Sequence, residues 1–274
     1  MSRPGNDVAR AYATAAPAWA AAPSRIYQAL ADALVATAPV ALAGRHVADL
    51  GAGTGTVSQA LTGEGADVVA FDLVAEMLAR APAARDGGRV PGVVADLLAL
   101  PVAAGAFDAA VAAFVLNHLT EPVAALREMA RIVRPGGAVL ASTFAAQPRH
   151  PAKVAVDEAA AEFGYQEPRW YTTMKAEAEP RTAGAERVRA VALEAGLRVL
   201  GVDERAVDIG ADTPEVIVAY RLGMAHLAPF VAGLDETRRD ALRTAAVEAL
   251  GSEVESLRPV VVFLDAQAPT RAGS

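Results

Sequence analysis

The sequence predicts an α/β fold in which a doubly wound, largely parallel sheet carries helices on both faces. Two observations support this prediction. Between residues 46 and 144, short apolar runs alternate with helical patterns, and this alternation is typical of right-handed strand–helix–strand units. The first apolar run is followed by three glycines at alternate positions, which suits a tight turn from a strand into a helix.

The glycine-rich turn follows a buried strand predicted at residues 46–50. Its three glycines are Gly51, Gly53 and Gly55. Side chains at these positions would obstruct the turn and would keep a ligand away from the backbone. The helix predicted next, at residues 54–61, presents free N–H groups and the positive end of its dipole to the turn. The turn is therefore a candidate ligand site.

Two carboxylates accompany this turn. Asp72 ends the next predicted strand, residues 68–72, where an acidic side chain accepts hydrogen bonds from ribose hydroxyls. Asp49 precedes the first glycine by two residues; it would repel a pyrophosphate but suits an ammonium or sulfonium centre. A dinucleotide fingerprint has its last glycine or alanine where this chain has Thr56. The set indicates an adenosine-type cofactor with a cationic group; a purely structural turn is the alternative.

The stretch from Asp49 to Gly55 resembles the first motif of class I S-adenosylmethionine (SAM) dependent methyltransferases, acidic-x-G-x-G-x-G. The run from Arg131 to Leu140 resembles a structural hallmark of the fifth strand in small-molecule members, nearest those of quinone and secondary-metabolite pathways. The resemblance implies a seven-stranded Rossmann-like methyltransferase sheet with a terminal antiparallel hairpin and a helical cap or lid insertion. It rests on motifs in residues 45–145 and on strand pattern elsewhere.

The remaining elements of the core are predicted from caps, breakers and apolar spacing. Residues 1–10 are polar and are expected to be frayed. Ser24 can cap a helix whose apolar residues recur every four positions up to residue 34. The later elements are a helix at 73–80, strands at 90–95 and 107–114, a helix capped by Thr120, and a strand at 138–144.

Beyond residue 144 the pattern changes to mainly helical material. Helices are predicted around residues 154–163, 182–195, 214–223, 225–231 and 235–250, and strands at 197–209 and 259–265 would supply the hairpin. We expect an N-terminal helical flap at 1–44 and a SAM-binding core at 45–145. Cap or lid insertions over the acceptor pocket are expected at 146–190 and 211–255, and C-terminal strands completing the sheet at 191–210 and 256–268.

The resemblance also implies which residues bind SAM and its product, S-adenosyl-L-homocysteine. The three glycines would lie beneath the methionine portion, with Asp49 supporting its amino group and Phe114 beside it. Asp72 would hold the ribose. The other implied cofactor contacts are Leu73, Met77, Asp96 and Leu97 around the adenine, and Tyr12 in a flap. Ordinary packing or strand capping by these residues is the alternative.

The acceptor pocket is expected in the loop after the fourth strand and in the cap. His118, next to Asn117, is the best-placed acid/base candidate, and a hydrogen-bonded loop histidine is the alternative. Methyl transfer chiefly requires alignment, so a base is needed only for a protonated acceptor, and methylation at C, O or N stays open. The other candidates, which suggest a flat or apolar acceptor unless they form the core of the cap, are His150, Tyr165, Trp170, Tyr171 and His226.

The composition excludes several classes of protein. The 274 residues are 53% hydrophobic and 21% charged, enough for one large domain with an insertion or small cap. A net charge of −7 argues against a nucleic-acid partner. Without cysteine, or histidines at helical ligand spacing, a metal site is not expected. With no secretory signal or long apolar run, we expect a cytoplasmic protein without a membrane partner; a homodimer or higher homo-oligomer is allowed.

Two rival functions share parts of this pattern. An NAD(P)-dependent oxidoreductase would share the sheet and Asp72, but Thr56 and the lack of a Tyr-x-x-x-Lys pair weigh against it. The second rival keeps the SAM pocket without methyl transfer, either catalysing a step such as cyclisation or acting as a binding partner. Fold analogy cannot separate that rival from a methyltransferase.

Overall fold

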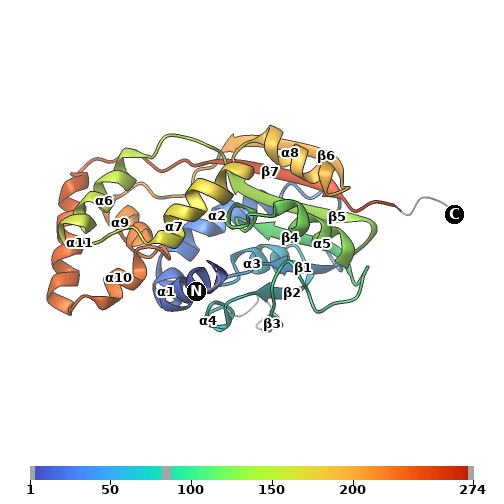
Figure 1. Cartoon of the computed structure of the whole chain (residues 1–274), viewed down its shortest axis with the longest axis horizontal. Coiled ribbons are helices and arrows are strands. Elements are labelled where there is room, and N and C mark those ends of the chain that lie inside the picture. Colours follow the sequence, from blue (N-terminus) through green and yellow to red (C-terminus); the bar gives the residue numbers. More distant parts are fainter. Residues whose placement is uncertain (1–3, 82–87, 271–274) are drawn as a thin grey trace.

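The computed structural model describes residues 4–81 and 88–270. Its sheet has seven strands in the order β3-β2-β1-β4-β5-β7-β6 (Figure 1). The first five strands are parallel, and β7 pairs antiparallel with both β5 and β6. The strands are β1 His46–Leu50, β2 Asp67–Asp72, β3 Gly92–Val94, β4 Phe107–Ala113, β5 Val133–Phe144, β6 Arg198–Ala206 and β7 Val260–Gln267. The predicted fold class, including the terminal hairpin, is confirmed.

Helices surround the sheet and extend beyond it. The α-helices are α1 Pro4–Ala21, α2 Pro23–Val35, α3 Thr56–Gly63, α4 Ala75–Leu78, α5 Pro122–Ile132, α6 Pro151–Glu162, α7 Arg169–Thr173, α8 Ala185–Glu194, α9 Pro214–Leu222, α10 Ala228–Gly233 and α11 Glu236–Leu250. A 3₁₀ turn, η1 (Leu116–His118), follows β4, and a π-helix, η2 (Met174–Ala178), continues from α7 into the 3₁₀ turn η3 (Glu179–Arg181). None of the helices in the described ranges is both long and apolar enough to cross a membrane.

Alternate residues of the strands point to two separate cores. In β5, Leu140 faces the core shared with α2 and α3, while Val139 and Ala141 face the core shared with α5 and α8. Both faces are therefore covered, which explains why the central strands are apolar along their whole length. Burying each large aliphatic side chain in this way contributes about 1.5–3 kcal/mol.

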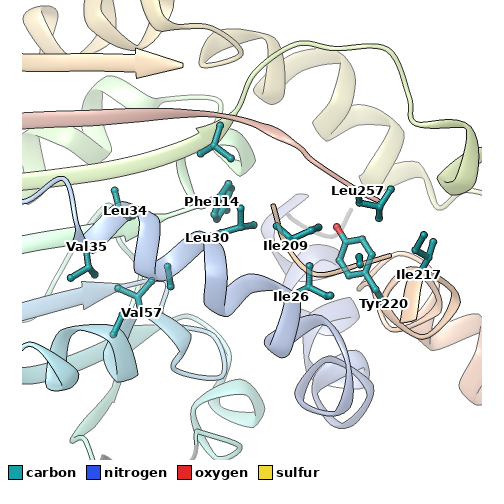
Figure 2. Close-up of a cluster of buried hydrophobic side chains, with 14 of the residues drawn as sticks. Ile26, Leu30, Leu34, Val35, Val57, Phe114, Ile209, Ile217, Tyr220 and Leu257 are labelled. Carbon is teal, nitrogen blue, oxygen red and sulfur yellow. The ribbon is translucent and has the colours of Figure 1, made fainter. Parts of the chain in front are cut away.

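One of the two cores continues from the sheet into the C-terminal helices. Figure 2 shows the side chains of Leu34, Leu30 and Ile26 along α2, followed by Ile209 and Tyr220. The helices α6, α9, α10 and α11 gather at one end of the molecule, away from β3 (Figure 1). Because the same cluster joins both parts, the C-terminal helices are held rigidly against the sheet.

Several predicted boundaries were wrong, mostly at helix starts. Residues 4–10, expected to be frayed, belong to α1; residues 1–3 lie outside the described part. Ser24 lies inside α2, where its hydroxyl donates to the carbonyl of Trp19, and Thr120 is not the N-cap of α5. In both cases a proline takes the first helical position, so the residue before that proline becomes the cap.

Other elements are shorter or longer than predicted. The helix predicted at 73–80 is only α4, and the strand predicted at 90–95 is only β3. By contrast, β5 begins at Val133, which pairs with Phe107, and the register between β4 and β5 shifts before pairing resumes at Ala138. The helical segment formed by α7, η2 and η3 was not predicted, since its sequence has no regular apolar spacing.

We predict that Gly137→Ala destabilises the sheet. A Cβ at residue 137 would lie 2.4 Å from the carbonyl oxygen of Asp108, a backbone atom in β4 that cannot move aside easily. Overpacking of this kind typically costs about 1–3 kcal/mol. Urea denaturation followed by circular dichroism should therefore show a lower midpoint. Gly201→Ala in β6 is the control, because a Cβ there meets nothing within 4 Å; equal midpoints for the two variants would contradict the prediction.

Candidate functional site

The glycine-rich turn between β1 and α3 adopts a backbone that favours glycine. Gly51, Gly53 and Gly55 have φ angles of 66°, 55° and 83°, all in the left-handed region. A Cβ at Gly51 would also lie 2.2 Å from the Cγ2 of Val115. The loop after β4 therefore packs directly against the turn, and the absence of side chains there is a requirement of the structure.

Asp72, at the end of β2, is bonded to the turn. Its Oδ2 accepts from the N–H of Gly53 at 2.7 Å, and its Oδ1 accepts from the N–H of Val74 at 2.8 Å. Burial raises the pKa of Asp72, while these backbone hydrogen bonds oppose the rise. Each carboxylate oxygen keeps a second lone pair. The side chain thus fixes the turn and can still accept hydrogen bonds from a ligand.

Asp49 is almost completely buried in β1, with 1% of its surface exposed. Its Oδ2 accepts from the hydroxyl of Ser58 at 2.6 Å, but its Oδ1 has no hydrogen-bond partner. Burial raises the pKa of Asp49 to about 7, against the opposing hydrogen bond from Ser58. A buried carboxylate with a free oxygen is costly unless a cation or donor meets it. The residues at the turn therefore fit a ligand that carries an ammonium or sulfonium group.

The residues predicted around an adenine do not form one closed pocket. Met77 is buried, and its Cε lies 3.5 Å from the position of a Cβ on Gly53. Leu73 is 51% exposed, whereas Leu97 is buried in the core. Asp96 is exposed and accepts from the N–H of Leu98, as an aspartate in a local turn does. Their role as cofactor contacts stays a prediction.

A cavity of about 400 Å³ opens beside the turn, between α3, α4 and β3. Gly53, Gly55, Leu78 and Val94 are among the residues that line it. Neither Asp49 nor Asp72 lines this cavity. The cavity therefore adjoins the turn, where it is lined by Gly53 and Ser58, the residues bonded to Asp72 and Asp49.

Helix α1 lies over the carboxyl ends of the strands and brings Tyr12 to the site. The hydroxyl of Tyr12 lies 3.3 Å from the Nε2 of His118, and the two rings meet edge to face at 5.7 Å. Burial raises the pKa of Tyr12, and the nearby charges of Asp72 and Tyr171 raise it further. Tyr12 thus lies between the end of β2 and the loop after β4.

His118 and Asn117 occupy η1 in that loop. The Nδ1 of His118 and the Oδ1 of Asn117 are buried without a hydrogen-bond partner in the described structure. Burial lowers the pKa of His118 to about 4, so the imidazole is neutral near pH 7. A neutral histidine with a free nitrogen can accept a proton or bind a polar group.

Phe114 is the one residue other than glycine in the described ranges with a positive φ, at 56°. Its ring stacks on Phe144 at 4.4 Å and meets the edge of Tyr27 at 5.4 Å. Strained backbone of this kind costs on the order of 1–3 kcal/mol and clusters at functional sites. The strain turns the chain from β4 into the loop that carries His118.

The cap contributes an aromatic and charged group of residues. The rings of Tyr171 and His226 stack at 3.9 Å with an interplanar angle of 1°, and Trp170 meets Tyr171 at 5.6 Å. Arg221 forms two hydrogen bonds with the carboxylate of Asp157, each of 2.7 Å. We missed this ion pair from the sequence, although an arginine within the apolar helix α9 was a signal for it.

Two predicted acceptor residues have other partners. His150 is the N-cap of α6, where its Nδ1 accepts from the N–H of Ala152. Tyr165 is buried and packs on Phe230, with ring centroids 5.5 Å apart. Their membership of an acceptor pocket stays a prediction. Within residues 4–81 and 88–270, no three metal-binding side chains gather into a candidate metal site.

Comparison with known proteins agrees with this architecture. Residues 48–141 match a family model described as a methyltransferase domain. The demethylmenaquinone methyltransferase of Beutenbergia cavernae is 40% identical over 108 residues, which cover 39% of this chain and 44% of that protein. Its counterpart in Mycolicibacterium vanbaalenii is 47% identical over 98 residues, covering 36% and 41%. The matched stretch thus spans less than half the length of these relatives.

Solved structures resemble the chain over most of its length. A putative methyltransferase from Bacillus halodurans has a TM-score of 0.54 and 19% identity, covering 88% of this chain and 99% of its own. The cyclase SpnF has a TM-score of 0.54 and 20% identity, covering 89% and 81%. At these identities the likeness concerns the fold. Residues 48–141 are thus similar to a methyltransferase domain, in line with the resemblance of the motifs, and the solved structures agree in fold.

The buried Asp49 predicts a specific pH dependence of stability. In the unfolded chain its carboxyl has an ordinary pKa of 3.8, and in the folded protein the pKa is about 7. The folded state therefore binds the proton more tightly, and stability from this group is lost as the pH rises from about 4 to 7. Relative to wild type, Asp49→Asn should gain stability over that interval, by up to roughly 4 kcal/mol.

Urea denaturation between pH 4 and pH 8 would measure this difference. Asp212→Asn is the control, because Asp212 is exposed. A difference in unfolding free energy between wild type and Asp49→Asn that stays constant with pH would contradict the prediction. It would mean that the Asp49 carboxylate is compensated in the folded protein.

Proposed function

We propose that this protein binds SAM and transfers its methyl group to a small-molecule acceptor related to quinones or secondary metabolites. The observation that carries the proposal is Asp49, a buried carboxylate with one unsatisfied oxygen at the head of the glycine turn. When bound, SAM supplies an electrophilic methyl group on a positively charged sulfur. The names of the curated relatives support this proposal, but those matches cover only part of each protein.

The residues around the turn would hold the cofactor in the following way. Asp49 would accept from its ammonium group, and Asp72 would accept from the ribose hydroxyls while keeping its bond to Gly53. Phe114 would pack beside the methionine portion. The remaining proposed contacts are Leu73, Met77, Asp96, Leu97 and Tyr12.

The elements around the site would orient the acceptor and exclude water. Helix α1 packs against α4, α7 and α10, and these contacts support its proposed role as a flap. Tyr12 and Trp19 of α1 and Tyr27 of α2 form a chain of aromatic rings, in which neighbouring ring centroids are 5.2–5.5 Å apart. Aromatic side chains of this kind fit a flat aromatic acceptor. Holding the acceptor in line with the methyl group can lower the activation barrier by about 7–11 kcal/mol.

His118 would serve as the base where the acceptor arrives protonated. Its pKa of about 4 keeps it neutral, and its contact with Tyr12 fixes the ring. The division into a flap (1–44) and cap insertions (146–190 and 211–255) and a cytoplasmic location belong to the same proposal. The helices over the site support the division, and the lack of cysteine supports the location. A homodimer or higher homo-oligomer stays a prediction.

We predict that Asp72→Ala weakens the binding of S-adenosylhomocysteine by roughly 10- to 100-fold. Hydrogen bonds to a charged group are worth about 1.5–3 kcal/mol, and the turn also loses its bond at Gly53. Isothermal titration calorimetry measures the affinity, with the exposed Asp212→Ala as a matched control. Unchanged affinity in Asp72→Ala would contradict the assignment of the ribose site. Binding of NAD in place of S-adenosylhomocysteine would favour an oxidoreductase.

We predict that His118→Gln lowers kcat by roughly 10²- to 10⁴-fold for a phenolic acceptor, the usual contribution of a general base. The affinity for S-adenosylhomocysteine should stay within about threefold, well below the tenfold step of 1.4 kcal/mol. Transfer of label from methyl-labelled SAM measures the rate. Tyr12→Phe, which removes only the hydroxyl beside His118, should lose less activity.

An unchanged kcat in His118→Gln would show that the acceptor arrives already nucleophilic. If the wild-type protein binds SAM but transfers no label to any acceptor, the protein uses its SAM pocket for another step, such as cyclisation.

A further inference from the structure

His226 is a buried histidine that neither the packing of the core nor the proposed methyl transfer requires. It lies in the short connection between α9 and α10, with 4% of its surface exposed. Its Nε2 has no hydrogen-bond partner in the described structure. Its ring is stacked flat on Tyr171, which occupies one face, and the edge that carries Nε2 is left to serve a ligand.

The charged groups around His226 are predominantly cationic. Arg221 shares the carboxylate of Asp157 with Arg149, so two guanidinium groups meet one carboxylate. The ammonium of Lys175 lies 5.2 Å from the centre of the Tyr171 ring, on which His226 stacks. Glu179 is the carboxylate that interacts with Lys175. Asp157 therefore does not neutralise the positive field of the two arginines.

This positive field, together with burial, determines the protonation state of the His226 imidazole. Burial, together with the nearby charges of Arg221, Lys175 and Arg149, lowers the pKa of His226 to about 2. The ring is therefore neutral at any physiological pH. A neutral imidazole carries one N–H, and it can donate that hydrogen to an acceptor oxygen without adding a charge of its own.

The same residues lie next to the proposed reaction site. Segment η2 follows α7, which carries Tyr171, and it contacts η1, which carries His118. Helix α7 also contacts α1, and Tyr171 is close enough to Tyr12 to raise its pKa. The group formed by His226, Tyr171 and Arg221 therefore lies near Tyr12 and the turn that carries His118.

We propose that His226, stacked on Tyr171 and backed by Arg221, is a subsite for an oxyanion on an aromatic acceptor. An enolate, phenolate or carboxylate oxygen there would accept from the imidazole N–H and gain from the nearby cations in a water-poor setting. The acceptor ring would lie among the aromatic side chains of the cap. The inference rests on the proposed function, which it deepens by giving the acceptor a negative charge.

The test compares acceptor probes of similar shape and different charge. The probes are 2-hydroxy-1,4-naphthoquinone, which is an enolate at neutral pH, its neutral 2-methoxy analogue, and 1-naphthoate. Calorimetry on the full chain at pH 7.5 should give the wild type at least about a tenfold preference for the enolate over the methoxy analogue, equivalent to 1.4 kcal/mol. His226→Phe keeps a ring for the stack on Tyr171 and removes the nitrogens, so the preference should fall to about threefold or less.

Two further variants keep the test decisive. His46→Phe is the matched control, because His46 packs on Phe107 at the start of β1, and it should retain the wild-type preference. If His226→Phe does not fold, His226→Gln, which keeps an N–H donor, should retain part of the preference. Comparing 1-naphthoate with the enolate shows which kind of oxyanion the subsite accepts.

Equal affinity of the wild type for charged and neutral probes, binding of no probe, or a full preference in His226→Phe would each overturn the inference. Titration of the same samples with S-adenosylhomocysteine separates this failure from failure of the proposed function. If S-adenosylhomocysteine binds while the preference is absent, only the subsite is wrong. If S-adenosylhomocysteine does not bind, the proposed function itself is wrong.

Discussion

The hydrogen bond from the N–H of Gly53 to Asp72 is the constraint on which the site depends. It ties the end of β2 to the turn after β1, so two parallel strand ends and one helix start are fixed relative to one another. The packing of Val115 on Gly51 adds the end of β4 to the same unit. With these strand ends joined, the sheet fixes the positions of Asp49 and Phe114, and the loop packed against the turn carries His118.

The cap is organised differently, because its contacts join segments far apart in the chain. Arg221 and Asp157 of the cap are 64 residues apart, and outside the cap Tyr12 of α1 meets His118, which is 106 residues away. Contacts of this kind leave no local pattern in the sequence. A continuous hydrophobic cluster runs along α2 to Tyr220 and includes residues of α6, α9 and α11 (Figure 2). The cap thus gains its geometry from the shared hydrophobic core.

The difference between local patterns and contacts of distant segments also explains what could be predicted from the sequence. The sheet, its hairpin and the glycine turn were predictable because apolar runs and glycines report local conformation. The starts of α2 and α5 were misplaced, because a proline at the first helical position outweighs the hydroxyl of Ser24 or Thr120 as a signal. His150 and Tyr165 were predicted only from their segment, and their partners depend on α6 and α10. Arg221 was missed for the same reason.

The two buried charge sites have opposite signs, and this suits the proposed chemistry. Asp49 would provide negative charge on the proposed cofactor side, and Arg221 with its neighbours would provide positive charge on the proposed acceptor side. A sulfonium donor and an oxyanion acceptor would each be held by the opposite charge, and their mutual attraction in a water-poor site would bring them together. As the methyl group moves, both charges disappear from the reacting atoms. Because a low-dielectric interior favours neutral products over separated ions, burial of the site would assist the transfer itself.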